Sequence, residues 1–321
     1  RLALSFTSWF KVPEQGMQSY ELLSRASAIV VTAKRPSTKV VHVVSALHVP
    51  CPFYFPNYYP KEDYPWLGAV KEEHVKNTVE FRSPSTGRLI EQFELERRIF
   101  AHPKRDLCVL HVKDERNFVT ACDRNRLDPV DLVALDEFSP LMPLTFHGHV
   151  LSEAGPPADD EGHQIPYVVD GKFNMGVGQQ LFARTTETLA MGMCGGPVVS
   201  SDRRCVGMLE GIVPSHPSPE TLSEQHRRVL RNAAFIPSGE LIGLLCGVED
   251  AMAAEERQRA EQERQGERHP EVAAAAAEEG EGGDVELPGS AVVTFDLPPE
   301  FLKDAAAAPE GHPANDGAKE S

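Results

Sequence analysis

Short runs of β-branched and other apolar residues, separated by polar turns, make up most of the chain before residue 216. The runs at 26–33 (ASAIVVTA) and 39–45 (KVVHVVS) flank a Pro-Ser turn and predict a β-hairpin. Further runs have the same strand pattern: 77–83, 87–95, 106–112, 142–151, 165–171, MCGGPVVSS and CVGMLEGIV. Many short strands at near-regular spacing predict an all-β barrel or sandwich.

Two stretches interrupt this pattern and have no periodicity of their own. CPFYFPNYYPKEDYPW is rich in Pro and Tyr, and we interpret it as a surface insertion. SEAGPPADDEGHQ, which separates the runs at 142–151 and 165–171, has the composition of a loop. The strands on either side are therefore expected to form the fold.

Helical patterns appear only toward the C-terminal part of the chain. Residues 218–233 begin with Ser-Pro-Glu, which is typical of a helix start. A second helix is predicted from Ser238 to Gln265, because ELIGLL is apolar and the following residues alternate Glu and Arg at the spacing of helix pairs. This second part has almost no apolar stripe, so we expect a solvated helix or a half-formed rod.

The chain beyond Gly266 consists of Ala runs, Gly-Glu repeats and prolines, and residues 267–321 are predicted to be disordered. One segment of this tail, SAVVTFDLPPEFL (290–302), is apolar enough to be a docking peptide or an added strand. The alternative is a loose apolar patch within a disordered tail.

The formal net charge of -16 is concentrated in the same tail. From Glu249 to Ser321 there are 19 acidic and 6 basic residues, whereas the first 248 residues have 29 acidic and 26 basic ones. The body is nearly neutral and lacks the basic surplus that binding to a phosphate backbone requires, so no nucleic-acid partner is expected. No run of eighteen apolar residues is present, so no membrane span is expected.

The six cysteines are spread along the chain without a Cys-x-x-Cys pair: Cys51, Cys108, Cys122, Cys194, Cys205 and Cys246. This spacing gives no support to a zinc site or a redox motif, and we expect neither a metal nor a cofactor. His147 and His149 alternate on one predicted strand but form no paired ligand motif. Such cysteine usage is typical of a reducing intracellular compartment, with most thiols acting as small apolar core residues.

One segment has the glycine frame that acyl-transfer chemistry needs. That chemistry requires a nucleophile, a base, a group that holds the base, and donors for the oxyanion. In MGMCGGP (191–197), Gly192 precedes Cys194 by two positions, and Gly195 and Gly196 follow it. A glycine at the earlier position lets its N–H turn inward, so Gly192 and Cys194 are the candidate oxyanion donors. Taken alone, Cys-Gly-Gly is more often a turn than an active site.

Two other segments resemble signatures of the trypsin-like proteases. VVSALHV (43–49) is similar to the segment around the catalytic histidine and places His48 there, and DLCVLHV is similar to the run that follows the catalytic aspartate and places Asp106 there. With Cys194 at the usual serine position, the order is His, Asp, nucleophile, with separations of 58 and 88 residues. The resemblance implies one β-barrel that carries His48 and Asp106 and a second that carries Cys194.

Over about residues 25–247, the chain resembles the HtrA/Deg branch of this family. TTETLAMGMCGGPVVSSDRRCVGM is similar to that branch's segment around the catalytic serine, and NAAFIPSGELIGLL (232–245) is similar to the run and helix that close its protease domain. The chain departs from the branch in having cysteine for serine, Met193 for the preceding asparagine, and no PDZ-like domain afterwards. The Gly-x-Cys-Gly-Gly form also resembles picornavirus-type proteases, in which cysteine is the nucleophile.

The predicted fold is therefore all-β, with two six-stranded antiparallel β-barrels of the trypsin-like kind, a C-terminal helix and a disordered acidic tail. The expected divisions are an N-terminal extension at 1–24, a peptidase domain at 25–247, a charged helix at 248–266 and the tail at 267–321. Within the peptidase domain, barrel 1 is expected at about 25–125 and barrel 2 at about 130–247.

The predicted function is cleavage of peptide bonds in protein or peptide substrates through a triad of Cys194, His48 and Asp106. The alternative is a catalytically inactive pseudoprotease that acts as a binding or structural subunit of a larger assembly. Thr188, six residues before Cys194, and Gly195 are the predicted residues of the substrate pocket. Because Thr188 is small and uncharged, we expect small or medium apolar residues to be preferred there over Lys or Arg.

The first residues, RLALSFTSWFKVP, include two basic and no acidic side chains, which is compatible with the remnant of an organellar targeting segment or with a plain extension. We expect a reducing intracellular compartment, either the mitochondrion or the cytoplasm. The aromatic part, SFTSWF (5–10), is a candidate surface for homo-oligomerisation. The acidic tail is a candidate attachment to a larger protein assembly.

Overall fold

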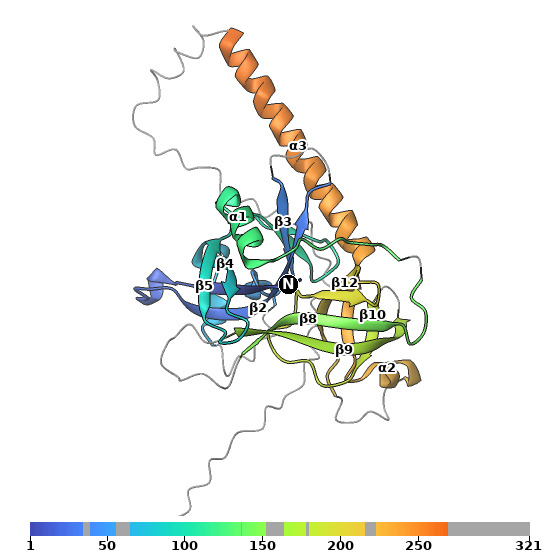
Figure 1. The fold of residues 1–321 in the computed structure, drawn as a ribbon. Helices are drawn as coiled ribbons and strands as arrows, with labels where there is room; N and C mark the ends of the chain where they lie inside the picture. Colours follow the sequence, from blue (N-terminus) through green and yellow to red (C-terminus); the bar gives the residue numbers. More distant parts are fainter. Residues whose placement is uncertain are drawn as a thin grey trace, which may run out of the picture.

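The structure, a computed structural model, describes residues 1–34, 39–55, 65–135, 137–151, 164–177, 180–215 and 223–268. Two antiparallel β units lie side by side, and the long helix α3 (Ser238–Arg268) leaves the second unit and rises away from both (Figure 1). Two shorter helices are α1 (Glu115–Asn125) and α2 (Glu224–Val229).

The first unit is a seven-stranded sheet with the order β5-β4-β1-β2-β3-β7-β6. Its two ends are joined, because Leu95 and Val112 form an antiparallel bridge and the Glu96 N–H donates to the His111 carbonyl at 2.8 Å. The sheet therefore curls toward closure, with β6 as a short strand beside β7. Its strands are β1 (Leu4–Phe10), β2 (Glu21–Thr32), β3 (Val41–Ser45), β4 (Val75–Arg82), β5 (Leu89–Glu94), β6 (Phe100–Ala101) and β7 (Cys108–Leu110).

The second unit is a closed barrel of six strands with the order β10-β13-β12-β11-β8-β9. The last strand in the sequence lies between β10 and β12 and closes the ring. The strands are β8 (Pro143–Leu151), β9 (Gln164–Val177), β10 (Gln180–Thr185), β11 (Pro197–Ser200), β12 (Cys205–Ile212) and β13 (Ala233–Pro237).

Each unit has its own apolar core, and the boundary between the units is apolar as well. Side chains on a strand alternate between its two faces, so one strand can serve both cores. On β12 and β13, Leu209 and Phe235 lie in the core of the second barrel, whereas Met208 and Ile236 belong to the core of the first unit. The outer wall of the second barrel therefore packs against the first unit.

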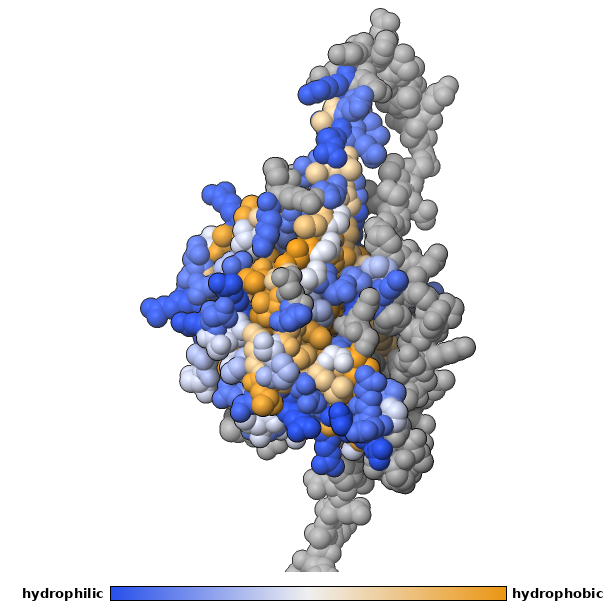
Figure 2. Space-filling view, turned by 90° about the vertical axis from the view of Figure 1, so that its right-hand side faces the viewer, coloured by the Kyte–Doolittle hydropathy of each residue, from blue (hydrophilic) through white to orange (hydrophobic). Residues whose placement is uncertain are grey.

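Helix α3 is anchored by an apolar stripe in its first turns. Leu241, Leu245 and Val248, at the spacing of one helix face, are buried in the first core. Further along, Glu255 pairs with Arg98 at 2.5 Å. The outer turns are covered by hydrophilic side chains, while hydrophobic residues gather on the body beside the helix (Figure 2).

A buried polar chain also ties α3 to the first sheet. His111 Nε2 lies 2.8 Å from His42 Nδ1, and His42 Nε2 lies 3.3 Å from Glu249 Oε1 on α3. The Lys34 backbone N–H donates to the same carboxylate oxygen at 3.0 Å. Neutral imidazoles satisfy both contacts when each Nε2 carries the proton. Burial lowers the pKa of His42, and burial together with the neighbouring charges lowers that of His111 to about 3.

The segment expected as an N-terminal extension contributes a strand to the first unit. Leu4–Phe10 forms β1, which pairs with β2 on one side and β4 on the other. Phe6 and Phe10 are buried in the protein's own cores, so the aromatic surface proposed for homo-oligomerisation is not exposed. A strand was not expected here because the polar and apolar residues of SFTSWF do not alternate strictly, so the pattern alone does not distinguish a strand from an extension.

The helices differ from their predicted bounds. Residues 238–265 were predicted as helical, and α3 covers them. Of the helix predicted at 218–233, the described part is helical only at Glu224–Val229, and Ala233 begins β13. Helix α1 was not predicted. It begins at an N-cap in which Asp114 accepts the Asn117 N–H, and Phe118, Ala121 and Cys122 are its buried residues.

The predicted all-β fold of two packed antiparallel units is confirmed, with a closed six-stranded barrel as the second unit. The first unit differs from the prediction in having seven strands instead of six. Several predicted segments lie wholly or partly outside the described residues: the insertion at 56–64, the loop at 152–163 and the tail at 269–321 with its apolar segment at 290–302. Among the described helices, none is both long and apolar enough to cross a membrane.

Candidate active site

His48 and Asp106 meet at one end of the first sheet. His48 follows β3 and Asp106 precedes β7, and these two strands are neighbours that pair Ser45 with Cys108. His48 Nδ1 lies 2.5 Å from Asp106 Oδ2, and the His48 backbone N–H donates to Asp106 Oδ1 at 2.8 Å. Both side chains are buried. The carboxylate therefore holds the imidazole at two points and fixes its orientation.

The Cys194 side chain comes from the second barrel to the other side of the same imidazole. Burial lowers the pKa of His48, but the Asp106 charge and hydrogen bond, together with a hydrogen bond to the Cys194 side chain, outweigh this and raise it to about 10. Cys194 is half-buried, whereas Cys51, Cys108, Cys122 and Cys205 are buried. The three residues predicted as a triad are thus brought together from two β units.

Cys194 lies in the turn between β10 and β11, which we call the Cys194 loop (residues 191–196). Gly192 has φ +98° and Gly195 has φ +82°, values in the left-handed region that favours glycine. Among the residues that the structure describes, the backbone N–H groups of Gly192 and Cys194 donate to no protein acceptor. Neither N–H group is used in a described backbone hydrogen bond, and their role as oxyanion donors stays a prediction.

Ser27 on β2 holds the Cys194 loop against the first sheet. Its hydroxyl donates to the Gly192 carbonyl at 2.8 Å and accepts from the His149 N–H at 2.9 Å, and its backbone N–H donates to the Cys194 carbonyl at 2.8 Å. The Ser27 carbonyl in turn accepts from the Ser45 hydroxyl at 2.8 Å. Sequence reasoning missed Ser27, because a serine within a β-branched run has no local signal of such a role.

Glu210 on β12 is a second residue that the sequence reasoning missed. Its carboxylate accepts from Gln180 Nε2 at 2.7 Å and is close enough to the charges of Asp106, His48 and Arg105 to respond to them. Burial raises the pKa of Glu210, the Asp106 charge raises it further, and Arg105 and His48 oppose the rise. The only signal in the sequence was an acidic residue inside the apolar run CVGMLEGIV.

The two residues predicted for the substrate pocket lie in different surroundings. Thr188 is exposed in the segment between β10 and the Cys194 loop. Gly195 is buried, its N–H donates to the Leu209 carbonyl at 2.8 Å, and an added Cβ would lie 2.2 Å from the Ser27 carbonyl oxygen. Gly195 therefore serves the close packing of the Cys194 loop, and the role of both residues in a pocket stays a prediction.

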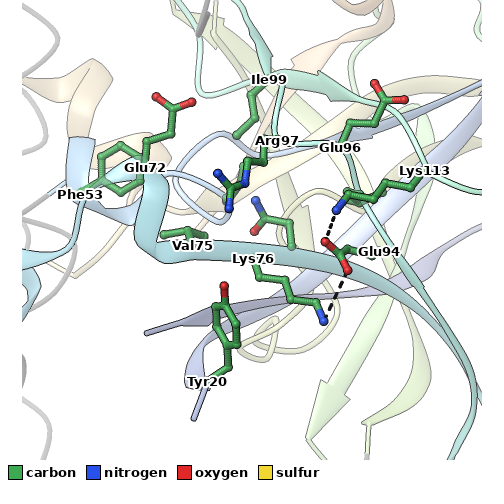
Figure 3. Close-up of a pocket in the computed structure, with 13 residues that line it drawn as sticks. Tyr20, Phe53, Glu72, Val75, Lys76, Glu94, Glu96, Arg97, Ile99 and Lys113 are labelled. Carbon is green, nitrogen blue, oxygen red and sulfur yellow. Dashed lines mark hydrogen bonds and ion pairs between the residues drawn. The ribbon is translucent and has the colours of Figure 1, made fainter. Parts of the chain in front are cut away.

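A cavity in the first unit lies near the candidate site but does not contain it. It is lined in part by Pro50 and Phe53, from the segment after His48, and by Glu94, which pairs with Lys76 at 3.6 Å and with Lys113 (Figure 3). None of the three predicted triad residues lines this cavity. The candidate site is therefore defined by the contacts of His48, Asp106 and Cys194 and not by this cavity.

No group of three His, Cys, Asp or Glu side chains in the described ranges is arranged to hold a metal ion. His147 instead contacts the Thr145 hydroxyl at 3.0 Å through Nε2. His149 is buried, and burial, followed by the charges of Arg1 and Arg82, lowers its pKa to about 3.

Comparison with known proteins gives matches of structure but none of sequence. No family model matches the sequence, and no curated protein matches it. Among solved structures, an HtrA-type protease, AlgW in a variant form with a tripeptide, is similar with a TM-score of 0.44 and 13% sequence identity. The aligned region covers 75% of this chain and 58% of that chain, so this chain spans less than two thirds of that protein's length.

Proposed function

We propose that this chain is a peptidase that cleaves peptide bonds in protein substrates with Cys194 as nucleophile. The observation that supports this most directly is the double hold of Asp106 on His48, with the Cys194 side chain hydrogen-bonded to the same imidazole. A nucleophile, a base beside it and a group that orients the base are the parts that acyl transfer needs.

In the proposed reaction, the Cys194 sulfur attacks the carbonyl carbon of the scissile peptide while His48 holds the thiol proton. The carbonyl π electrons move to the oxygen, which the Gly192 and Cys194 N–H groups stabilise. The C–N bond then breaks, His48 gives its proton to the departing amine, and a thioester remains. His48 then takes a proton from water, whose oxygen attacks the thioester carbonyl carbon. The C–S bond breaks, the carboxylic acid product leaves, and His48 gives its proton to the Cys194 sulfur.

The proposed substrate-binding site is the edge of β12 beside the Cys194 loop. Leu209 on β12 exchanges backbone hydrogen bonds with Gly195 and Gly196, each 2.8 Å long. Beyond Leu209, β12 pairs with β13 through Gly211 and Ile212, and within the described residues no strand pairs with its other edge. An extended peptide can add to such an edge by main-chain hydrogen bonds, which would place a peptide bond near Cys194.

A thiol-alkylation experiment tests the proposal. At neutral pH we expect iodoacetamide to modify Cys194 at least about tenfold faster than Cys246, because an adjacent base promotes the thiolate that reacts. Cys246 on α3 is the matched control, since it is also half-buried but lies on a helix and not in the Cys194 loop. In H48A, the Cys194 rate should fall to that of Cys246.

Hydrolysis of an unstructured protein such as casein, abolished in C194A, completes the test. Equal alkylation rates for Cys194 and Cys246, together with hydrolysis that survives C194A, would overturn the proposal. A chain with no hydrolytic activity and an unreactive Cys194 would leave the pseudoprotease alternative, in which the same cleft serves binding within an assembly. The mitochondrial or cytoplasmic location stays a proposal as well.

A further inference from the structure

Glu210 occupies a special position on the strand proposed to receive the substrate. The pairing of β12 with β13 shifts register between Leu209 and Gly211, so Glu210 is the extra residue of a β-bulge. Bulges redirect the side chain that they carry. Since Leu209 bonds directly to the Cys194 loop, the Glu210 backbone is one residue away from that loop.

The Glu210 carboxylate faces the catalytic side of the molecule. Its hydrogen-bond donor is Gln180, at the first position of β10, and the charges that act on it include those of Asp106, Arg105 and His48. The side chain is half-buried, so part of it remains exposed to solvent. A peptide added to the free edge of β12 could therefore reach the exposed part.

The carboxylate has a neutral partner instead of a cationic one. Gln180 donates one hydrogen bond, and among the described residues Arg105 and His48 act on the carboxylate through their charges, without a direct ion pair to it. Partly buried carboxylates are costly unless they are paired. A cation from outside the chain would supply the missing partner and gain a charge-assisted hydrogen bond.

We propose that Glu210 is the specificity-determining residue of the cleft, binding a Lys or Arg side chain that lies within a few residues of the scissile bond of the substrate. This inference rests on the proposed substrate-binding site along β12. It differs from the preference for small or medium apolar residues expected from Thr188, because the basic side chain would bind at β12 and not at Thr188. Arg fits especially well, since its guanidinium can bond to both carboxylate oxygens.

A binding experiment tests the inference without depending on catalysis. The background is C194A, which retains the cleft but cannot cleave. Fluorescein-labelled hexapeptides of Ala and Ser carry either Arg or citrulline, scanned through three central positions, and binding is measured by fluorescence anisotropy. Citrulline has nearly the same shape as Arg without its charge, so the ratio of the two affinities isolates the charge.

At one position we expect the Arg peptide to bind about tenfold more tightly than the citrulline peptide, and C194A/E210Q should reduce this ratio to about one. The matched control is C194A/E187Q, which removes an exposed carboxylate near the same loop and should leave the ratio unchanged. Thermal unfolding of both double variants establishes that they fold. Absence of any Arg preference in C194A, or a preference that survives E210Q, would overturn the inference.

The test separates this inference from the proposed function. If the unaltered chain hydrolyses no protein, yet C194A binds Arg peptides in a Glu210-dependent way, the peptidase proposal fails and the recognition stands. If the chain hydrolyses proteins but the Arg preference is independent of Glu210, the peptidase proposal stands and the inference about Glu210 fails.

Discussion

The Ser27 hydroxyl donates to the Gly192 carbonyl at 2.8 Å, across a sequence separation of 165 residues. The peptide unit that contains this carbonyl is planar, so holding its oxygen also fixes the N–H of Met193. This unit lies between the Gly192 N–H and the Cys194 N–H, so a rotation that breaks the bond to Ser27 would also disturb the two donors proposed for the oxyanion. The first sheet thereby sets the conformation of a loop in the second barrel.

We expect S27A to lower kcat about tenfold or more with a smaller change in KM, because donor positioning matters most in the transition state. The free energy of unfolding should fall by about 1–2 kcal/mol, since the His149 N–H and the Gly192 carbonyl both lose their partner. Steady-state kinetics and urea unfolding measure the two effects. S24A is the control for the loss of a serine hydroxyl: Ser24 is on the same strand but donates to the Val49 carbonyl at 3.2 Å and not to the Cys194 loop. Similar kcat losses in both variants would contradict a positioning role for Ser27.

The raised pKa of His48 predicts a loss of stability at alkaline pH. The ordinary value is 6.5 and the folded value is about 10, so the folded chain binds more protons than the unfolded chain between these limits. The stabilisation is fully present below pH 6.5 and disappears as pH rises through about 10, by an amount of a few kcal/mol. Urea unfolding at a series of pH values measures this slope.

In D106N the same slope should nearly vanish, because the charge that retains the proton on His48 is gone. Hydrolysis by D106N should fall at least about a hundredfold, since the imidazole loses its orienting acceptor. A pH slope identical in D106N and the unaltered chain would show that other groups are responsible.

The buried His42–His111 pair predicts the opposite behaviour at acid pH. The folded pKa of His111 is about 3 against an ordinary 6.5, so stability is present above pH 6.5 and is lost as pH falls toward 3. At pH 4.5 the loss from this group is about 2–3 kcal/mol. His149 adds a loss of its own, so the contribution of His111 is the difference between the unaltered chain and H111Q in unfolding measured from pH 7 to 4. An H111Q slope as steep as that of the unaltered chain would contradict this account.

Two glycine substitutions should act in opposite directions. An added Cβ at Gly196 would lie 1.9 Å from the His147 carbonyl oxygen and 3.0 Å from that of Met193, so G196A should destabilise the fold by about 3 kcal/mol or more. At Gly243 on α3, an added Cβ would have no atom within 4 Å outside its own helix backbone and chain neighbours. G243A should therefore raise the free energy of unfolding by about 0.5–1 kcal/mol through helix propensity. Thermal unfolding checks both, and a tolerated G196A would show that the Cys194 loop is looser than described.

The strand runs and the meeting of His48 with Asp106 could be predicted from the sequence because each depends on local pattern. VVSALHV and DLCVLHV end and begin strands that pair with each other, so short motifs were enough to bring His48 and Asp106 together. Helix α1 escaped because its apolar positions, Phe118, Ala121 and Cys122, occupy only one short stripe within a polar segment. The strand at Leu4–Phe10 was not predicted because its burial depends on pairing with β2 and β4, whose paired residues lie 11 or more positions away in the sequence.

Ser27 and Glu210 could not be predicted as site residues for a different reason. Their roles come from contacts between elements that lie far apart in the chain: β2 with the Cys194 loop, and the bulge of β12 with Gln180 and Asp106. A bulge depends on the register of two strands, and register is a tertiary property. Single-sequence patterns contain the residue type but not the partner.

The position of β13 affects the order in which the protein folds during its synthesis. Because Ala233–Pro237 lies between β10 and β12, the second barrel cannot close until this late segment has left the ribosome. Until then the emerging chain holds an imidazole and a carboxylate in one half and an unsupported thiol in the other. The order of synthesis thus delays the meeting of Cys194 with His48 until the chain has been made as far as Pro237.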